Sequence, residues 1–297
     1  MKCDLCPRKC LVDRKKGEKG ICGQTENLKV ARAALHFWEE PCISGDAGSG
    51  AVFFSGCPLH CVFCQNENIA NGTVGKEISL ERLVDIFLEL QEKRANNINL
   101  VTPGHFVPQI VKALDQARRE GLTLPVVYNT SSYETVDTIK MLEGYVDIYL
   151  PDFKYMSPVL SKKYSHAPDY AEVAKAAIAE MVRQTGKAVF VNGDEDKLIL
   201  SGTIVRHLTL PGCMADSMQI LKYLHDTYGD KIYISIMNQF TPLSNLEKYP
   251  ELNRRITDEE YETLVDYAID IGIENGFIQE GDTAEESFIP AFDCEGV

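Results

Sequence analysis

Apolar positions along the chain alternate between short continuous runs and longer stretches with helical spacing. In residues 79–94, Leu80, Leu83, Val84 and Phe87 recur at intervals of three and four, which predicts a helix that Ser79 caps. Further helices are expected at 107–120, 134–142, 157–164, 170–185, 214–228 and 257–271.

The short apolar runs between these helices predict strands. They lie at 51–54, 97–102, 124–128, 146–150, 188–191, 204–210 and 232–237. The run 204–210 is either the strand that follows 188–191 in the sheet or its direct partner. Apolar strands that alternate with helices favour a parallel sheet with right-handed crossovers. We therefore expect an α/β fold, a partial (β/α)6 TIM-like barrel over residues 46–297, preceded by a Cys-rich extension over residues 1–45.

The composition limits the partners and the setting of this 297-residue chain. Its 44 acidic and 30 basic residues give a net charge of −14, which should repel nucleic acid and anionic membranes. The basic residues between Arg8 and Lys19 are interpreted as a solvated loop. No stretch resembles a signal peptide, and none approaches the roughly 18 apolar residues of a membrane span. Ten cysteines without secretion indicate reduced thiols that bind metals or clusters, so we expect a cytoplasmic, anaerobic setting.

Three cysteines, Cys57, Cys61 and Cys64, follow the first predicted strand with the spacing CxxxCxxC. A cuboidal [4Fe–4S] cluster normally takes one thiolate per iron from four cysteines, so three thiolates on one loop leave the fourth iron open. A structural zinc site and three unrelated core thiols are the alternatives. Zinc sites usually add a second, distant pair of ligands to a CxxC pair, and core cysteines have no reason to gather on a polar loop. The spacing therefore favours a cluster.

This loop resembles the radical S-adenosylmethionine (SAM) superfamily, because Gly56 precedes the motif, Phe63 stands before its last cysteine and Gln65 follows it. Within the superfamily, the chain is most similar to relatives of the pyruvate formate-lyase activating enzymes, in the PflX-like branch. The likeness extends from Cys3 to about Glu280. Gln65 is a departure, since many activating enzymes read Cys-His-Asn-Pro where this chain reads Cys-Gln-Asn-Glu. The resemblance implies a barrel of the radical SAM type.

The resemblance also implies an enzyme with two cofactors, a [4Fe–4S] cluster on the three cysteines and SAM chelated to the open iron. Electron transfer from the cluster would cleave SAM reductively to a 5′-deoxyadenosyl radical, which abstracts hydrogen from a substrate. An activating enzyme would act on a glycyl radical protein, and an electron donor of flavodoxin or ferredoxin type would supply the electron. Two alternatives stay open. One is radical chemistry on a small molecule or peptide, and the other is an iron–sulfur or zinc protein without turnover.

Polar residues follow the other predicted strands, at the carboxyl ends where (β/α) barrels carry their functional groups. The resemblance implies that Thr102 and Gly104 lie against the amino group of SAM, and that Asp152 and Lys154 lie beside its methionine part. Phe63 is expected to pack by the adenine. The full expected set of SAM-binding residues is Phe63, Gln65, Thr102, Gly104, Asn129, Ser131, Asp152, Lys154, His207 and Asn238.

Some members of this set have a structural explanation as well. Asn129 and Ser131 could bind a ribose or a carboxylate, or helix capping by Ser132 could explain the polar run. His207 could reach the cofactor or be a hydrogen-bonded core histidine, because alternation along the strand sends one of Arg206 and His207 inward.

A second set of cysteines precedes the predicted barrel: Cys3, Cys6, Cys10 and Cys22. A CxxC pair followed by two further thiols is ordinary metal-ligand spacing. Four thiolates would close a tetrahedral zinc site or hold a second iron–sulfur cluster without an open iron, and four free thiols are the third alternative. A polar loop of this length has no core of its own, so metal binding would supply its order. Cys42 is either an alternative ligand or a small buried residue, and Cys213 and Cys294 are expected to be incidental.

Overall fold

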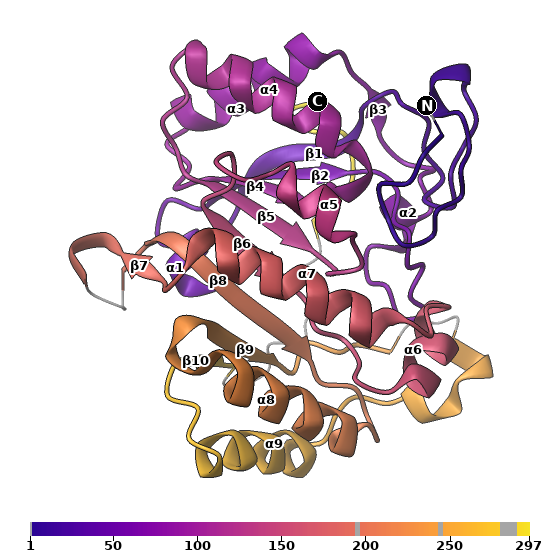
Figure 1. Cartoon of the computed structure of the whole chain (residues 1–297), viewed down its shortest axis with the longest axis vertical. Coiled ribbons are helices and arrows are strands. Elements are labelled where there is room, and N and C mark those ends of the chain that lie inside the picture. Colours follow the sequence, from indigo (N-terminus) through magenta and orange to yellow (C-terminus); the bar gives the residue numbers. More distant parts are fainter. Residues whose placement is uncertain (1, 194–196, 243–245, 280–289) are drawn as a thin grey trace.

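A computed structural model of the chain describes residues 2–193, 197–242, 246–279 and 290–297 (Figure 1). Its strands are β1 (Lys29–His36), β2 (Ser49–Phe54), β3 (Lys76–Glu77), β4 (Ile98–Val101), β5 (Val126–Thr130), β6 (Ile148–Pro151), β7 (Val189–Phe190), β8 (Ile199–Leu208), β9 (Tyr233–Met237) and β10 (Gly276–Ile278). Its helices are α1 (Pro41–Ser44), α2 (Glu67–Ala70), α3 (Leu80–Glu92), α4 (Val107–Arg119), α5 (Val136–Lys140), α6 (Pro158–Ser165), α7 (Tyr170–Thr185), α8 (Met214–Tyr228) and α9 (Asp258–Asp270).

The described strands form one sheet in the order β10-β9-β8-β6-β5-β4-β2-β1-β3, with β7 paired to β8. The six neighbours from β2 to β9 in this order pair in parallel, which confirms the predicted parallel sheet. At one end β10 adds a parallel strand, and at the other β1 pairs with β2 in the antiparallel direction. The two ends of the described sheet do not pair with each other, so the barrel is partial and open, as expected.

Three strands, β1, β3 and β10, have no counterpart among the sequence predictions. β1 is rich in alanine, which favours helices, and β10 has only three residues. β1 falls within residues 1–45, and it joins the sheet of the barrel. The predicted run 188–191 becomes β7, a two-residue strand antiparallel to β8, which is the direct pairing that the sequence left open.

The long helices α3 and α9 begin close to their predicted starts, where local side-chain caps form. The Ser79 hydroxyl accepts a hydrogen bond from the Arg82 amide at 3.1 Å, at the start of α3. At the start of α9, Thr257 and Glu260 form a reciprocal capping box. Such caps satisfy amides that the first helical turn leaves without a partner.

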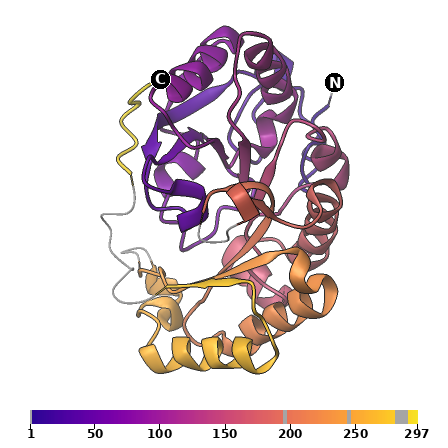
Figure 2. The ribbon, with the colours of Figure 1, turned by 90° about the vertical axis from the view of Figure 1, so that its left-hand side faces the viewer.

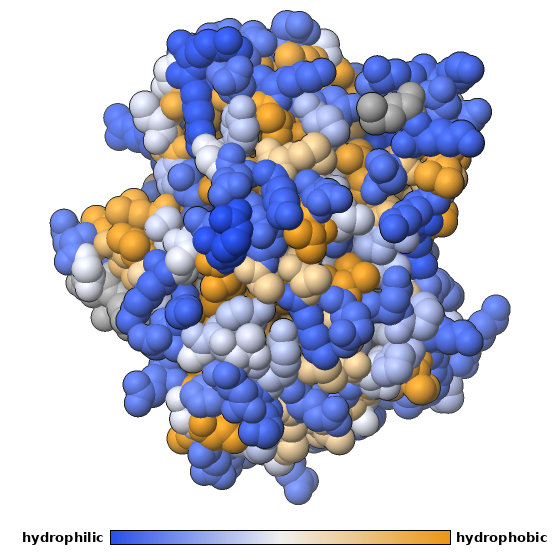
Figure 3. Space-filling model, viewed as in Figure 1, coloured by the Kyte–Doolittle hydropathy of each residue, from blue (hydrophilic) through white to orange (hydrophobic). Residues whose placement is uncertain are grey.

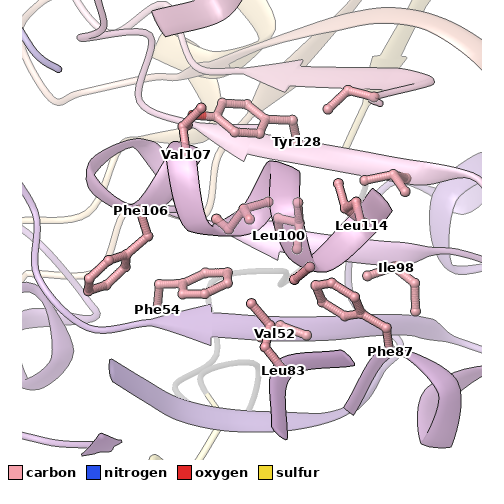
Figure 4. Close-up of a cluster of buried hydrophobic side chains, with 14 of the residues drawn as sticks. Val52, Phe54, Leu83, Phe87, Ile98, Leu100, Phe106, Val107, Leu114 and Tyr128 are labelled. Carbon is pink, nitrogen blue, oxygen red and sulfur yellow. The ribbon is translucent and has the colours of Figure 1, made fainter. Parts of the chain in front are cut away.

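The central strands β2, β4, β5 and β6 are buried at every position. This is the pattern of parallel strands with both faces covered. On the outer side, α3 and α4 pack against the sheet through a cluster that includes Phe54, Phe87, Leu100, Phe106 and Tyr128 (Figure 4). Burying one such side chain contributes about 1.5–3 kcal/mol, so this layer holds the strand ends in fixed positions.

The last residues of the chain run beside β1 (Figure 2). The Ala33 amide donates to the Glu295 carbonyl at 2.9 Å, and the Cys294 amide donates to the Ala31 carbonyl at 3.0 Å. Arg32 forms ion pairs with Asp293 and Glu295. The segment 290–297 therefore covers part of the free edge of β1.

On the helix-covered face, hydrophilic residues predominate and apolar residues occur in small groups (Figure 3). None of the helices in the described ranges is long and apolar enough to cross a membrane.

Candidate functional site

The thiols of Cys57, Cys61 and Cys64 line one cavity of about 260 Å3 at the carboxyl ends of the parallel strands. The loop that carries them begins directly after β2, whose buried residues fix its starting point. The Phe63 ring lies at the same cavity, packed against Tyr155 and Phe240 with ring centroids 6.5 and 5.9 Å away. The three predicted cluster ligands therefore lie at the carboxyl ends of the parallel strands, the edge of the sheet where functional groups of such barrels are expected.

Two residues of the cysteine loop, Gly56 and His60, have a positive φ. Gly56 has φ 95°, and a Cβ there would lie 2.5 Å from the Cys22 carbonyl oxygen, so a larger residue does not fit. His60 has φ 51°, and its Nε2 lies 2.8 Å from the Ile21 carbonyl oxygen. Both residues contact the chain around Cys22, so the two cysteine regions meet at this loop.

Burial controls the protonation of the three thiols. It raises the pKa of Cys57 to about 11 and that of Cys64 to about 12, and the neighbouring cysteines add to both shifts. Burial also raises the pKa of Cys61, while the Lys154 ammonium acts in the opposite direction. Three thiolates at this cavity therefore need a strongly cationic partner, which the iron core of a cluster provides. The donor set fits the cluster that the resemblance implies.

A charged network of Asp152, Lys154 and Arg206 lines the same cavity. Lys154 Nζ lies 2.6 Å from Asp152 Oδ2, and Arg206 Nε lies 2.9 Å from Asp152 Oδ1. Burial opposes ionisation of Asp152, but the two cations outweigh it and lower the pKa of this carboxyl. The network therefore presents fixed charges to the cavity.

Arg206 extends the network to two further residues. Its Nη1 donates to Glu39 Oε2 at 2.9 Å, and its Nη2 donates to Asn129 Oδ1 at 2.6 Å. Glu39 Oε1 accepts from the side-chain amide of Asn129 at 3.1 Å. Sequence reasoning missed Glu39, which lies between β1 and α1 and has no strand-end signal. It named Arg206 only as the neighbour of His207.

Most of the expected SAM-binding residues line this cavity: Phe63, Gln65, Thr102, Asn129, Ser131, Asp152 and Lys154. Gln65 is held there by a 2.9 Å hydrogen bond from its side-chain amide to the Gln239 carbonyl. Thr102, directly after β4, has φ 55°, and Ser132, two residues after β5, has φ 62°. A β-branched residue such as Thr102 rarely adopts this left-handed conformation. Backbone strain of this kind is common at functional sites.

Three residues of the expected set lie outside the lining of the cavity. His207 is buried among core residues, with Nδ1 2.8 Å from the Phe153 carbonyl oxygen and Nε2 2.9 Å from the Ser217 hydroxyl. Burial lowers its pKa to about 4, as for a neutral core histidine. A Cβ on Gly104 would lie 2.9 Å from the Glu134 carboxyl carbon, so this glycine admits a close contact with Glu134. The Asn238 amide bonds to Gln279.

The four N-terminal cysteines also come together. Burial raises the pKa of Cys6 to about 12, and the charges of Cys22, Cys3 and Cys10 add to this shift. A Cβ on Gly20 would lie 3.2 Å from Cys10 Sγ and 3.4 Å from Cys22 Sγ, so these two sulfurs flank one small residue. The four thiols are thus gathered in one part of the N-terminal lobe, which we define as residues 2–28.

Two arginines attach the N-terminal lobe to the barrel. Arg8 donates to the carbonyls of Pro58, Ser165 and His166, at 2.9, 3.0 and 2.6 Å. Arg14 is buried and donates to the carbonyls of Thr25 and His105. The expectation that the basic residues form a solvated loop is therefore wrong for these two.

Neither Arg8 nor Arg14 pairs with a carboxylate in the part of the chain that the structure describes. Their positive charges are instead available to offset negative charge nearby. Burial raises the pKa of the Cys22 thiol, and the Arg14 guanidinium acts against this rise. This arrangement fits an anionic centre of four thiolates around a metal or cluster.

No three His, Cys, Asp or Glu side chains converge on a single-ion site within the described ranges. Cys42 is buried in an apolar cluster with Ile43, which fits the small buried residue that was the alternative to a ligand.

Comparison with known proteins supports the fold. Residues 51–197 match the family model of the radical SAM superfamily. An uncharacterized protein of Methanocaldococcus jannaschii is 28% identical over 272 residues, which are 90% of this chain and 74% of that protein.

Two solved structures are similar in fold. The first is HydG, a maturase of the [FeFe]-hydrogenase, with a TM-score of 0.51 and 15% identity over 78% of this chain and 52% of that one. The second is Streptococcus suis SuiB, with a TM-score of 0.50 and 10% identity over 79% of this chain and 49% of that one. The chain spans about half the length of these proteins.

Proposed function

We propose, from the premise that this chain belongs to the radical SAM superfamily, that it is an enzyme which cleaves SAM reductively and abstracts hydrogen from a bound substrate. Cys57, Cys61 and Cys64 would hold a [4Fe–4S] cluster, and SAM would occupy the adjoining part of the cavity. When bound together, these two groups supply the reductive cleavage of the sulfonium.

One observation carries this proposal: the three thiols and the network of Asp152, Lys154 and Arg206 face the same cavity. A protein that only stores or senses a metal needs the thiols, but it has no use for fixed charges opposite them. SAM carries an ammonium and a carboxylate on its methionine part, and this network presents both signs of charge. The colocation therefore favours catalysis over the alternative of a metal-binding protein without turnover.

The residues of the chain would act by binding and orientation. Asp152 and Lys154 would pair with the ammonium and the carboxylate of the methionine part, and Arg206 would keep Asp152 ionised. Phe63 would pack against the adenine, and Asn129 and Ser131 offer polar groups for the ribose or the carboxylate. The apolar wall of Leu59, Phe63 and Phe240 would keep water from the reacting atoms.

The test is anaerobic reconstitution of the full chain with iron and sulfide, followed by a reductant and SAM. We expect formation of 5′-deoxyadenosine that depends on both additions. Bound iron without 5′-deoxyadenosine would instead support the non-catalytic alternative. The physiological reductant, an electron donor of flavodoxin or ferredoxin type, stays a prediction.

We also propose that Cys3, Cys6, Cys10 and Cys22 hold a second iron–sulfur cluster, with zinc as the alternative. The gathered thiols and the two arginines without carboxylate partners in the described structure support this assignment. The division into a Cys-rich extension at 1–45 and a barrel at 46–297 stays a proposal with it.

The hydrogen donor is a separate question. A glycyl radical protein, the substrate that the PflX-like resemblance implies, would have to insert a loop into the open side of the barrel. A second cavity of about 950 Å3 adjoins the first one, close to the upper end of the range of about 300–1,000 Å3 for small-molecule sites. This cavity supports a small molecule as the substrate.

A further inference from the structure

The larger cavity lies between the segment that follows β1 and the strands β8 to β10. It shares five residues with the cofactor cavity: Trp38, Glu39, Arg206, Met237 and Gln239. A molecule bound in it would therefore lie against the same wall as the proposed SAM site. Its position is that of a substrate beside a cofactor.

Glu40 is the feature of this cavity that no structural role explains. It lines the cavity but is only 9% exposed. The Ser235 hydroxyl bonds to its carboxylate, while Oε2 has no hydrogen-bond partner among the residues that the structure describes. A buried carboxylate oxygen without a donor is costly, so a proton, a water molecule or a ligand has to satisfy it.

The nearest cation does not satisfy Glu40. Each of the three guanidinium nitrogens of Arg206 donates to another residue, namely Asp152, Glu39 or Asn129, and Arg206 acts on Glu40 only through space. Lys154 is paired with Asp152. Glu39 and Asp152 are thus paired with these two cations, whereas Glu40 forms no ion pair with another described residue. Burial raises the pKa of Glu40, and a cationic ligand beside it would favour its ionised form.

Two aromatic side chains flank the same cavity. Phe37 and Trp38 are 49% and 57% exposed, and both line it. Aromatic faces bind apolar groups and also attract cations. The cavity therefore combines two exposed aromatic side chains with the buried carboxyl group of Glu40.

We propose that this cavity binds the substrate, and that the substrate is an organic amine whose cationic nitrogen pairs with Glu40 and whose apolar part contacts Phe37 and Trp38. This inference rests on the proposed function, because it assigns the substrate class of the same reaction. It gives Glu40 a binding role and leaves the cofactor to the neighbouring cavity.

The chain offers a direct probe of binding, because Trp38 is its single tryptophan. The full chain, reconstituted anaerobically, would be titrated with 2-phenylethylamine while the fluorescence of Trp38 is followed. Matched titrations would use 2-phenylethanol, which is neutral, and 3-phenylpropionate, which is an anion. We expect saturable binding of the amine, with the alcohol and the acid each weaker by roughly tenfold or more.

The matched variants are Glu40→Gln and Asp46→Asn. Glu40→Gln should weaken binding of the amine by roughly tenfold to a hundredfold and leave that of the alcohol nearly unchanged. Asp46 lines the same cavity but is exposed, so Asp46→Asn should weaken the amine by no more than about fivefold.

Equal binding of the amine and the alcohol by the parent chain would overturn the inference, whether or not the variants fold. So would unchanged affinity of Glu40→Gln for the amine. Because fluorescence needs no turnover, the two proposals fail separately. Amine binding without 5′-deoxyadenosine would remove the proposed function, and 5′-deoxyadenosine without selective amine binding would remove the substrate class.

Discussion

The cysteine loop after β2 and the N-terminal lobe use the same ligand type in different settings. The loop starts from a fully buried strand, and its three thiols face a cavity with charged and polar walls. The N-terminal lobe contains one 3-10 turn, Arg14–Lys16, and no longer element before β1 in its described residues. The barrel itself positions the three loop cysteines, whereas the N-terminal lobe needs further contacts that attach it to the barrel.

Different contacts hold the cysteine loop and the N-terminal lobe in place. The loop is fixed by the strand before it, by the special conformation of Gly56 and by the contact of His60 with Ile21. The N-terminal lobe is held by Arg8 and Arg14, whose guanidinium groups donate to carbonyls of the barrel. A rigid scaffold can leave a ligand position open for chemistry, whereas a segment without a core has more to gain from a closed site that orders it.

The largest expected effect concerns the loop. Cys57→Ala, Cys61→Ala or Cys64→Ala should each abolish formation of 5′-deoxyadenosine, because one iron loses its thiolate and the open site is no longer unique. The measurement is chromatography of the products after anaerobic reconstitution. Cys213→Ala is the control, and near-normal turnover by any of the three variants would overturn the assignment.

The next effect concerns the N-terminal lobe. A chain that lacks all three loop cysteines should still bind iron or zinc, since Cys3, Cys6, Cys10 and Cys22 remain. Adding Cys6→Ala and Cys22→Ala should remove that metal, because a four-thiolate site then keeps only two ligands. Elemental analysis of the purified proteins checks both statements. A triple variant that is folded but free of metal would count against the second site.

A smaller effect is expected at the charged wall that only the loop region has. Asp152→Ala should weaken SAM binding by about tenfold to a hundredfold, the equivalent of charge-assisted hydrogen bonds of roughly 1.5–3 kcal/mol. The absorbance of the cluster should not change. Asp115→Ala, which removes an exposed ion pair with Arg119, is the control. If Asp152→Ala binds SAM as tightly as the parent, this pair has only a structural role.

The smallest effect tests how the N-terminal lobe is held. Arg14→Gln should lower the free energy of unfolding by roughly 1–3 kcal/mol, because it leaves buried carbonyls without a donor. Arg255→Gln, at an exposed position, should change it by no more than about 0.5 kcal/mol. Anaerobic denaturant titrations measure both. Equal stability of Arg14→Gln and the parent would show that the lobe is held by other contacts.

Local patterns predicted the elements that depend on local physics. The helices α3 and α9 begin where Ser79 and Thr257 cap them, and the apolar runs became parallel strands of the sheet. The strand β1 escaped prediction because its alanines carry no strand signal, and only its pairing with β2 makes it a strand. Where neighbours along the sheet decide the structure, the local pattern is not sufficient.

The strand β8 shows the same limit within the site. Alternation required that one of Arg206 and His207 face inward, but both are polar residues between apolar ones. Arg206 shares its face with Leu208, which also lines the cofactor cavity, and His207 shares its face with Val205, which packs in the apolar cluster of α8. The sequence predicted that Arg206 and His207 lie on opposite faces of β8, but it did not predict which of the two lies on the face of the cavity.

By itself, the sequence predicted the ligand chemistry, because Cys57, Cys61 and Cys64 lie on one short loop and this spacing needs no distant partner. It also predicted the central parallel strands and the long helices between them, and with them the edge of the sheet where the functional groups meet. The tertiary structure alone decided that Glu39 joins Arg206 across 167 positions of the chain, and that Glu40 lies buried without a partner for Oε2 in the described structure. The reason is physical. Ligand spacing and helical periodicity act over a few residues, whereas burial and charge pairing depend on which distant segments the folded sheet brings together.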